Sequence, residues 1–310
     1  MNTGLRAGAL AVLVACGVAL IVVLHQAREQ TPLESTFTSA FQIVGAPLKL
    51  ADRVASRVLP VSELDEKALG DVYRASYDPQ ATPASREQRY LDSLVAELQP
   101  LTGKPFPSRA YVVDYPVPNA MALPGGVVLV TRDLLTTLRS ESELAAVLAH
   151  EIGHIERGHC FDTVRFELLA RKVGAEPLGA LADFAAAILL RHSYSKTMEH
   201  EADAYALEML TNGRYDPRGV AGGFESLLSY EQAHGEPSPQ QASPIRDYFT
   251  SHPPLEVRAE EFGQRADAWW RRHPGERRYV GARNLQALVA LPRHELADEW
   301  TGSQPPLAKQ

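Results

Sequence analysis

The chain is poor in cysteine and has no excess of positive charge. Its only cysteines, Cys16 and Cys160, lie in an N-terminal apolar run and beside a group of histidines, where they are badly placed to pair. A small domain held together by a disulfide framework is therefore excluded. The formal net charge is −7. Because nucleic-acid-binding domains present a basic surface, this charge argues against nucleic acid as a partner.

Only one hydrophobic run is long enough to approach the thickness of a bilayer. Residues 7–24 (AGALAVLVACGVALIVVL) are uncharged and follow Arg6. As a helix rising about 1.5 Å per residue, this run nearly crosses the hydrocarbon core. No clear A-x-A cleavage site follows it, and Arg6 favours a cytoplasmic N-terminus. We therefore expect residues 1–28 to hold a signal anchor that stays in the membrane.

Two alternatives to the anchor remain open. Residues 13–16 (LVAC) resemble a bacterial lipoprotein signal, in which Cys16 would become the acylated first residue. Against this, the chain stays apolar through residue 24, where a mature lipoprotein normally turns polar. The second alternative is a cleaved secretory signal. All three interpretations place the bulk of the chain outside the cytoplasm, in the bacterial cell envelope.

Patterning divides the rest of the chain into three parts. Residues 29–60 hold a polar connector and an amphipathic helix over 47–59 that we expect to dock on the domain. Residues 61–264 mix helical periodicity with two strand patterns. The helices are expected over residues 62–75, 85–98, 178–190 and 196–210, and the strands over residues 110–114 and 126–131. Residues 265–310 are expected to form a small helical appendage with a frayed tail.

Residues 149–160 (AHEIGHIERGHC) concentrate three histidines and two glutamates in otherwise apolar surroundings. A capping box of Ser140 with glutamate three residues later predicts the start of a helix that runs through this stretch. On that helix His150 and His154 project from one face, one turn apart, and Glu151 lies beside them. This is the H-E-x-x-H arrangement, in which two imidazoles bind zinc and the glutamate reaches a metal-bound water.

A third ligand does not follow within the same stretch. His159 lies nine residues after His150, about 180° round a continuous helix, so it should face away from the metal. The longer H-E-x-x-H-x-x-G-x-x-H motif would need glycine and histidine where this chain has Arg157 and Cys160. Because a catalytic zinc takes three protein ligands, the missing one should come from a second helix.

Residues 199–203 (EHEAD), on the predicted helix 196–210, offer that ligand. Glu199 and Asp203 lie one turn apart on one face of the helix. One of them can therefore bind the metal while the other orients a ligand imidazole from behind. His200 and Glu201 are alternative ligands from the same helix.

Four stretches together resemble the family of membrane-associated zinc peptidases that includes the HtpX heat-shock protease and the type I CAAX prenyl protease. They are H-E-I-G-H at 150–154, E-x-x-A-D at 199–203, N-A-M-A-L-P-G-G at 119–126, and T-S-H-P-P at 250–254 followed by Arg258. The resemblance implies an α+β fold: a predominantly helical gluzincin metallopeptidase domain with a small β-sheet. Because the chain lacks several long membrane spans, it is closer to the single-anchor or periplasmic members.

The resemblance also implies the cofactor and the chemistry. One zinc ion per chain would be held by His150, His154 and Glu199, with Asp203 behind the ligands. Zinc lowers the pKa of its bound water to about 7 and polarises the scissile carbonyl. Glu151 would take the proton of this water and pass it to the leaving amine.

The substrate expected from this resemblance is an extended or unfolded polypeptide. Residues 119–123 would form an exposed strand edge that pairs with an extended substrate backbone. The residues expected to bind substrate are Asn119, Ala120, Met121, Ala122 and Arg258. Backbone pairing of this kind gives only modest sequence specificity.

His252 lies in a stretch stiffened by two prolines, which biases its backbone toward an extended form. A rigid loop that presents one imidazole could serve the zinc site in two ways. His252 could donate a hydrogen bond to the oxyanion of the reaction, and we favour this catalytic role. It could instead occupy the open metal position as a latch, or belong to a surface turn.

The sequence thus predicts a zinc-dependent metalloendopeptidase of the cell envelope that acts in protein quality control. The alternative is a latent or inactive peptidase-fold protein that works as a chaperone-like factor. The intact ligand set and Glu151 argue against loss of activity, whereas a latch leaves no trace in the sequence.

Overall fold

The computed structural model describes residues 63–78, 83–165, 178–189, 194–234 and 255–302, which belong to the unit Val61–Gln310. The predicted anchor over residues 7–24, the predicted helix 47–59 and His252 lie outside the described residues. Within the described part, no helix combines the length and the apolar character that a membrane span requires.

A small sheet has the strand order β1-β3-β2. Its strands are β1 (Arg109–Val113), β2 (Ala120–Leu123) and β3 (Val127–Thr131), and β3 runs parallel to β1 and antiparallel to β2. Both strands expected from the sequence are confirmed to within one residue. The tight turn from β2 to β3 contains Gly125 and Gly126, which have φ angles of +81° and +88° that favour glycine.

Helices make up most of the described fold, as the sequence predicts. They are α3 (Glu63–Tyr77), α4 (Arg86–Leu98), α5 (Arg132–Thr137), α6 (Glu141–Glu156), α8 (Leu178–Leu189), α9 (Lys196–Asn212), α10 (Gly219–His234), α12 (Leu255–Arg272) and α13 (Ala282–Ala287), with short 3-10 turns η1 (Gln99–Leu101) and η3 (Ala297–Glu299). The four helices expected over residues 62–75, 85–98, 178–190 and 196–210 correspond to α3, α4, α8 and α9.

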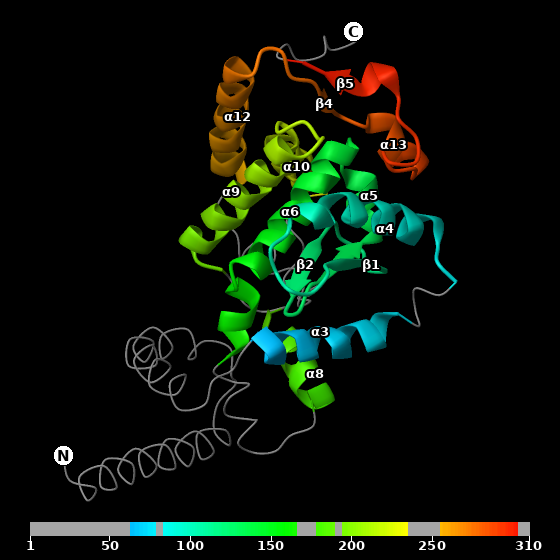
Figure 1. Ribbon diagram of the computed structural model, residues 1–310, viewed down its shortest axis with the longest axis vertical. Helices are drawn as coiled ribbons and strands as arrows, with labels where there is room; N and C mark the ends of the chain where they lie inside the picture. The colour runs from blue at the N-terminus through cyan, green and yellow to red at the C-terminus, as the bar shows by residue number, and fades with distance from the viewer. Residues whose placement is uncertain (1–62, 79–82, 166–177, 190–193, 235–254, 303–310) are drawn as a thin grey trace, which may run out of the picture. The chain divides into compact units, whose positions relative to one another are not determined.

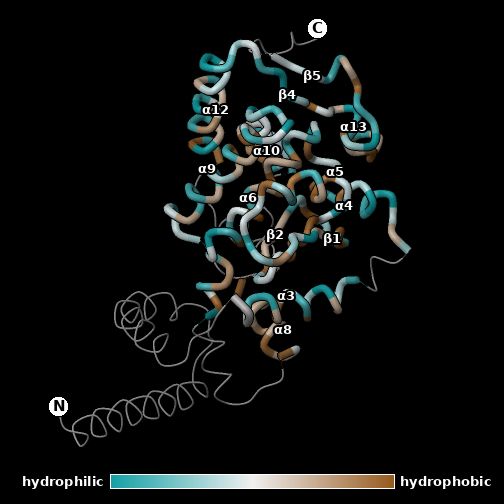
Figure 2. The backbone as a smooth tube through the Cα atoms, in the orientation of Figure 1, coloured by the Kyte–Doolittle hydropathy of each residue, from teal (hydrophilic) through white to brown (hydrophobic). Residues whose placement is uncertain are grey.

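The most buried helix is α6, which lies between the sheet and the other large helices (Figure 1). It contacts α9, α10 and β2. Figure 2 shows hydrophobic positions gathered around α6 and the strands, whereas α12 carries many hydrophilic positions. At Gly153 an added Cβ would lie 3.2 Å from Tyr205 of α9. A small residue at this point therefore lets α9 approach the histidine-bearing turn of α6 closely.

The C-terminal segment differs from the expected helical appendage. The helix α12 runs across the predicted boundary between residues 264 and 265, and a two-stranded sheet of β4 (Arg278–Tyr279) and β5 (Trp300–Thr301) follows. This segment packs on the start of α6: the Glu141 amide donates to the carbonyl of Gly281, and the Ser142 amide donates to that of Val280. It therefore satisfies N–H groups that every helix leaves unpaired at its first turn.

Candidate metal centre

The helix that carries the histidines begins where the sequence predicts. Ser140 is the N-cap of α6, and its hydroxyl accepts a hydrogen bond from the Glu143 amide at 3.3 Å. The Glu143 carboxylate accepts from the amide of Arg139, at 2.8 Å, rather than from the amide of Ser140. Half of the predicted capping box therefore forms, and it still fixes the start of the helix.

His150, His154 and Glu199 are buried together and could hold a metal ion. The Nε2 atoms of the two histidines are 3.1 Å apart. The carboxylate oxygens of Glu199 lie 3.6 Å from Nε2 of His150 and 3.5 Å from Nε2 of His154. Tetrahedral zinc with ligand bonds of about 2.0–2.1 Å places its donor atoms about 3.3 Å apart. The three residues therefore fit zinc both in donor chemistry and in spacing.

Asp203 supports the first histidine from behind. Nδ1 of His150 lies 2.8 Å from Oδ1 of Asp203, which leaves Nε2 directed at Glu199. Arg258 donates to both carboxylate oxygens of Asp203, from Nε at 2.8 Å and from Nη2 at 2.6 Å. Burial opposes the ionisation of Asp203, but His150 and Arg258 outweigh it and lower the pKa of Asp203 to about 2. Asp203 is therefore a charged partner that orients the ligand imidazole.

Glu151 connects the metal helix to the edge of the sheet. Its side chain is buried, and Oε2 accepts a hydrogen bond from the Ala122 amide at 2.8 Å. Ala122 lies on β2, an edge strand among the described residues. The strand predicted to bind substrate thus touches the residue predicted as general base. Against the expectation of an exposed edge, the side chains of Ala120, Ala122 and Leu123 are buried.

His159 is outside the metal group, as predicted, but the prediction that it faces away from the ligand histidines is wrong, because the helix does not continue. The last residue of α6 is Glu156, and Gly158 follows in the left-handed region with φ of +77°. The chain turns there, and Nδ1 of His159 comes to 3.1 Å from Nδ1 of His154. Gly158 was the available signal, since glycine often ends a helix in this conformation.

One further neighbour of His154, Tyr194, has no signal in the sequence. Tyr194 stacks on the His154 ring with centroids 4.1 Å apart and planes at 24°. Its hydroxyl donates to Sγ of Cys160 at 3.4 Å. Burial raises the pKa of Cys160 well above its usual value, so this thiol is a packing group and not a thiolate ligand.

Of the other residues predicted for the metal or the substrate, Arg258 lies beside the metal group, whereas His200 and Glu201 lie outside it. The alternative ligands His200 and Glu201 do not join the metal group: His200 is exposed near Glu261, and Glu201 contacts His159. Arg258 is buried against Asp203, and its guanidinium also lies over the ring of Phe224 at 4.3 Å. This placement supports the metal site from within, whereas the sequence predicted that Arg258 binds substrate.

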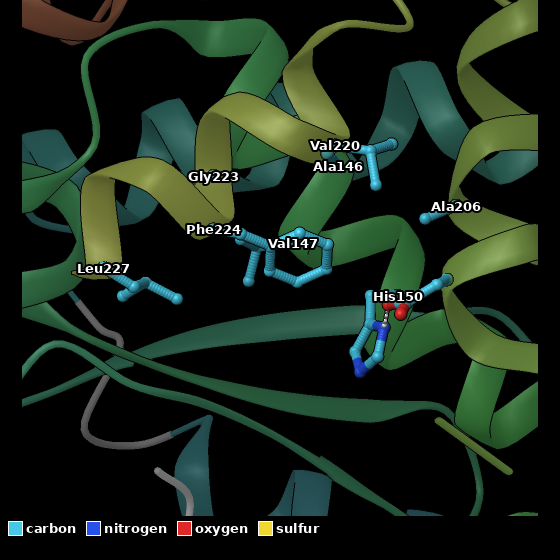
Figure 3. Close-up of a pocket in the computed structure, with 9 residues that line it drawn as sticks. Ala146, Val147, His150, Ala206, Val220, Gly223, Phe224 and Leu227 are labelled. Atoms are coloured by element: carbon cyan, nitrogen blue, oxygen red, sulfur yellow. Dashed lines mark ion pairs between the residues drawn. The ribbon is translucent and has the colours of Figure 1, made fainter. Parts of the chain in front are cut away.

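A small apolar cavity borders the site on the side of His150. Its volume is about 20 Å³, and it lies between α6, α9 and α10. Figure 3 shows His150 at one side of the cavity and Leu227 at the other, with Phe224 and Val147 between them. Apolar side chains therefore surround one face of the His150 imidazole. They keep water away from the ring and help to hold its orientation.

Comparison with known proteins agrees with this geometry. The profile of peptidase family M48 matches residues 85–266, more than half of the chain. Metalloprotease LoiP of Escherichia coli (strain K12) is 26% identical over 272 residues, which cover 83% of this chain and 97% of LoiP. Metalloprotease YcaL of the same organism is 25% identical over 229 residues, which cover 68% of this chain and 84% of YcaL.

Mitochondrial metalloendopeptidase OMA1 of Arabidopsis thaliana is similar to a shorter stretch of the chain. It is 29% identical over 157 residues, and the match spans 49% of this chain but only 30% of OMA1. The segment that matches the family contains His150, His154 and Glu199 with the spacing that zinc requires. The chain therefore belongs to peptidase family M48 and is a zinc metalloprotease.

Proposed function

We propose that the protein is an endopeptidase of the bacterial cell envelope that hydrolyses extended or misfolded polypeptides. The observation that carries this proposal is the contact between Glu151 and the Ala122 amide, because it joins the metal group to the edge of a sheet. A hydrolytic centre beside an edge strand suits a substrate that arrives as an extended chain.

The metal would be held by His150, His154 and Glu199. When bound, zinc supplies Lewis acidity, which acidifies water and polarises a carbonyl group. The protein residues keep the donors in place: Asp203 fixes His150, and Arg258 keeps Asp203 charged. We assign Arg258 to this positioning role in place of the expected contact with substrate.

Glu151 is the general base in this proposal. It follows His150 directly on α6, and the Ala122 amide orients its carboxylate. An ionised carboxylate accepts the proton of the attacking water and then gives it to the amine that leaves. No other acidic residue among those described combines a place beside the metal ligands with a contact to the edge strand.

Substrate would bind along β2. In the antiparallel pairing with β3, alternate residues direct their backbone groups away from the partner strand. The Ala122 amide is one such outward group, as its bond to Glu151 requires, and by the same alternation Ala120 is another. Because Glu151 occupies the Ala122 amide, an extended peptide would pair with the outward backbone groups of Ala120 and with the carbonyl of Ala122. Asn119 adds a buried Oδ1 atom that has no hydrogen-bond partner in the described part of the chain.

The proposed location rests on the sequence. The uncharged residues 7–24 suit an anchor, with the acylated Cys16 and the cleaved signal as alternatives. Intact mass of the membrane-extracted protein distinguishes the three. A full-length mass supports the anchor, a chain that starts at an acylated Cys16 supports the lipoprotein, and a shorter unmodified chain supports a cleaved signal.

The direct test of the activity is Glu151→Gln in the full-length protein. We expect zinc to remain near one ion per chain while casein cleavage falls by at least about 100-fold, because the base is lost and the ligands stay. Glu156→Gln is the matched control: it changes the same functional group on the same helix, where Glu156 accepts hydrogen bonds from Gly103 and Lys104.

Two outcomes would contradict the proposal. Equal cleavage by the wild type and Glu151→Gln would remove Glu151 as base. A zinc-loaded wild type that cleaves neither casein nor other unfolded proteins would instead favour the latent or chaperone-like alternative.

A further inference from the structure

The two ligand histidines are supported from behind in different ways. Nδ1 of His150 meets the Asp203 carboxylate directly, at 2.8 Å. Nδ1 of His154 meets another imidazole, that of His159, at 3.1 Å. Nε2 of His159 in turn lies 3.1 Å from Oε2 of Glu201. A carboxylate of α9 therefore supports each ligand histidine. Asp203 contacts His150 directly, and Glu201 acts on His154 through the ring of His159.

The chain geometry makes this second arrangement specific. The left-handed turn at Gly158 returns the chain toward α6, and the following residue, His159, is 4% exposed. Its ring meets the ring of His154 edge to face, with centroids 5.1 Å apart and planes at 69°. Glu201 lies on α9 two residues from Glu199, which turns it about 200° from the face that carries the metal ligand. One short segment of α9 thus reaches both sides of His154.

The positions of the protons follow from the ligand role of His154. When Nε2 of His154 binds a metal, Nδ1 of that ring must carry the hydrogen and donate it. Nδ1 of His159 must then accept, so the hydrogen of the His159 ring is on Nε2. That N–H donates to Glu201, which as a carboxylate can only accept. We call the series His154, His159 and Glu201 the relay. Only one placement of the ring hydrogens lets each donor in this relay meet an acceptor.

We propose that His159 and Glu201 are positioning residues for the zinc ligand His154. Glu201 holds His159 in the tautomer that accepts at Nδ1, and His159 holds His154 in the tautomer that presents Nε2 to the metal. This inference rests on the proposed zinc site. Outer partners of ligand histidines typically contribute 10–100-fold to metal affinity.

The packing around His154 complements this role. Tyr194 stacks on its ring and fixes the plane in which the imidazole lies. Stacking does not select which nitrogen carries the hydrogen, whereas the bond to His159 does. Glu201 is half-exposed, with 50% of its side chain accessible. Because exposed ion pairs contribute little to stability, the role we assign to Glu201 is the direction of a hydrogen bond and not the strength of a salt bridge.

The sharpest test compares Glu201→Lys with Glu201→Gln in the full-length protein. Glutamine keeps an oxygen that accepts from Nε2 of His159, so zinc affinity should stay within about 3-fold of wild type. Lysine can only donate, which forces the hydrogen of His159 onto Nδ1, where it opposes the Nδ1 hydrogen of His154. Zinc affinity, measured by competition with a chelator, should then fall by about 10–100-fold.

Glu208→Lys is the matched control, because Glu208 is an exposed residue of the same helix and its reversal changes the net charge equally. It should bind zinc as the wild type does. Equal affinity of Glu201→Lys and Glu208→Lys would overturn the inference. A wild type that binds no zinc would instead refute the proposed zinc site, so the two failures are distinguishable.

A second pair of variants covers the possibility that Glu201→Lys does not fold. In His159→Asn, Oδ1 takes the place of Nδ1 as acceptor, whereas His159→Phe keeps the ring volume and loses the acceptor. We expect His159→Asn to bind zinc at least about 5-fold more tightly than His159→Phe. Equal zinc affinities of these two would overturn the relay.

The tautomer itself can be observed. Long-range ¹H–¹⁵N correlation spectra of zinc-loaded protein labelled at histidine report which ring nitrogen carries hydrogen. The signals that disappear in His159→Asn assign the ring. Hydrogen on Nε2 of His159 supports the inference, and hydrogen on Nδ1 would overturn it.

Discussion

Two buried carboxylates in this protein lie in opposite electrostatic states. Glu141, at the start of α6, and Asp203, beside the metal ligands, are 0% and 1% exposed. Burial raises the pKa of Glu141 to about 7, although Leu291 and Tyr215 donate hydrogen bonds to it. Burial acts on Asp203 as well, yet its pKa falls to about 2 because of His150 and Arg258.

The difference shows that neutral donors do not replace a cation in a buried site. Glu141 even lies at a helix N-terminus, which favours an anion by about 0.3–1 kcal/mol. The rise of its pKa from 4.5 to about 7 corresponds to about 3 kcal/mol in the other direction. Desolvation therefore dominates at Glu141, whereas the guanidinium and the imidazole dominate at Asp203. Asp203 stays ionised beside the metal ligands because the buried guanidinium of Arg258 contacts its carboxylate.

The largest expected effect comes from removing that cation. Arg258→Met leaves the Asp203 carboxylate buried without its guanidinium, and we expect a loss of about 3–5 kcal/mol in the free energy of unfolding, together with weaker zinc binding. Urea unfolding of the metal-free protein measures the first effect. Arg265→Met, on the exposed side of the same helix, should cost under about 1 kcal/mol. Similar losses in both variants would show that Arg258 contributes only as a surface residue does.

The second prediction concerns Glu141 and its dependence on pH. A pKa raised in the folded state gives stability that is full below pH 4.5 and is lost as the pH rises through about 7. Glu141→Gln keeps an acceptor oxygen and cannot ionise. We therefore expect little change near pH 4.5 and a gain of about 3 kcal/mol at pH 8 relative to wild type. Unfolding curves of the metal-free proteins at several pH values test this. Parallel curves for the two proteins would contradict the raised pKa.

The smallest expected effect comes from Asp71, an exposed carboxylate that extends the comparison from buried to solvated ion pairs. Asp71 also has a lowered pKa, because Lys67 and Arg74 bind its carboxylate, but half of this side chain is exposed. Water screens such pairs, so Asp71→Asn should change the free energy of unfolding by about 0.5 kcal/mol or less. A loss of several kcal/mol would mean that nearby cations matter as much in water as in the interior.

The sequence predicts the parts of the fold that depend on local pattern. The N-cap at Ser140, the strand around Val128 and the facing pair His150 and His154 all follow from spacing along the chain, and the structure has them. The carboxylate ligand required a second helix, and the motif at residues 199–203 indicated it. Helical periodicity and metal geometry are therefore enough to find the two histidines and the helix of the third donor, whereas the family resemblance is needed to select Glu199.

Apart from Asp203, the supports behind the donors could not be predicted in the same way. The role of Arg258 depends on how α12 packs against α9, and that of Tyr194 depends on a contact across chain segments with no common motif. His159 was misplaced because a single left-handed residue, Gly158, changes the direction of the chain. Tertiary packing and one backbone angle decide these positions, and neither is expressed in residue spacing.

The cap on α6 has a consequence for how the protein is made. The Glu141 amide bonds to Gly281, and the Glu141 carboxylate accepts from Leu291, which is 150 residues further along the chain. Synthesis at about 5–20 residues per second puts an interval on the order of ten seconds between the two partners. In that interval the nascent chain carries its histidines on a helix whose first turn is unfinished. Completion of the first turn of α6 is thus postponed until most of the polypeptide has been synthesised.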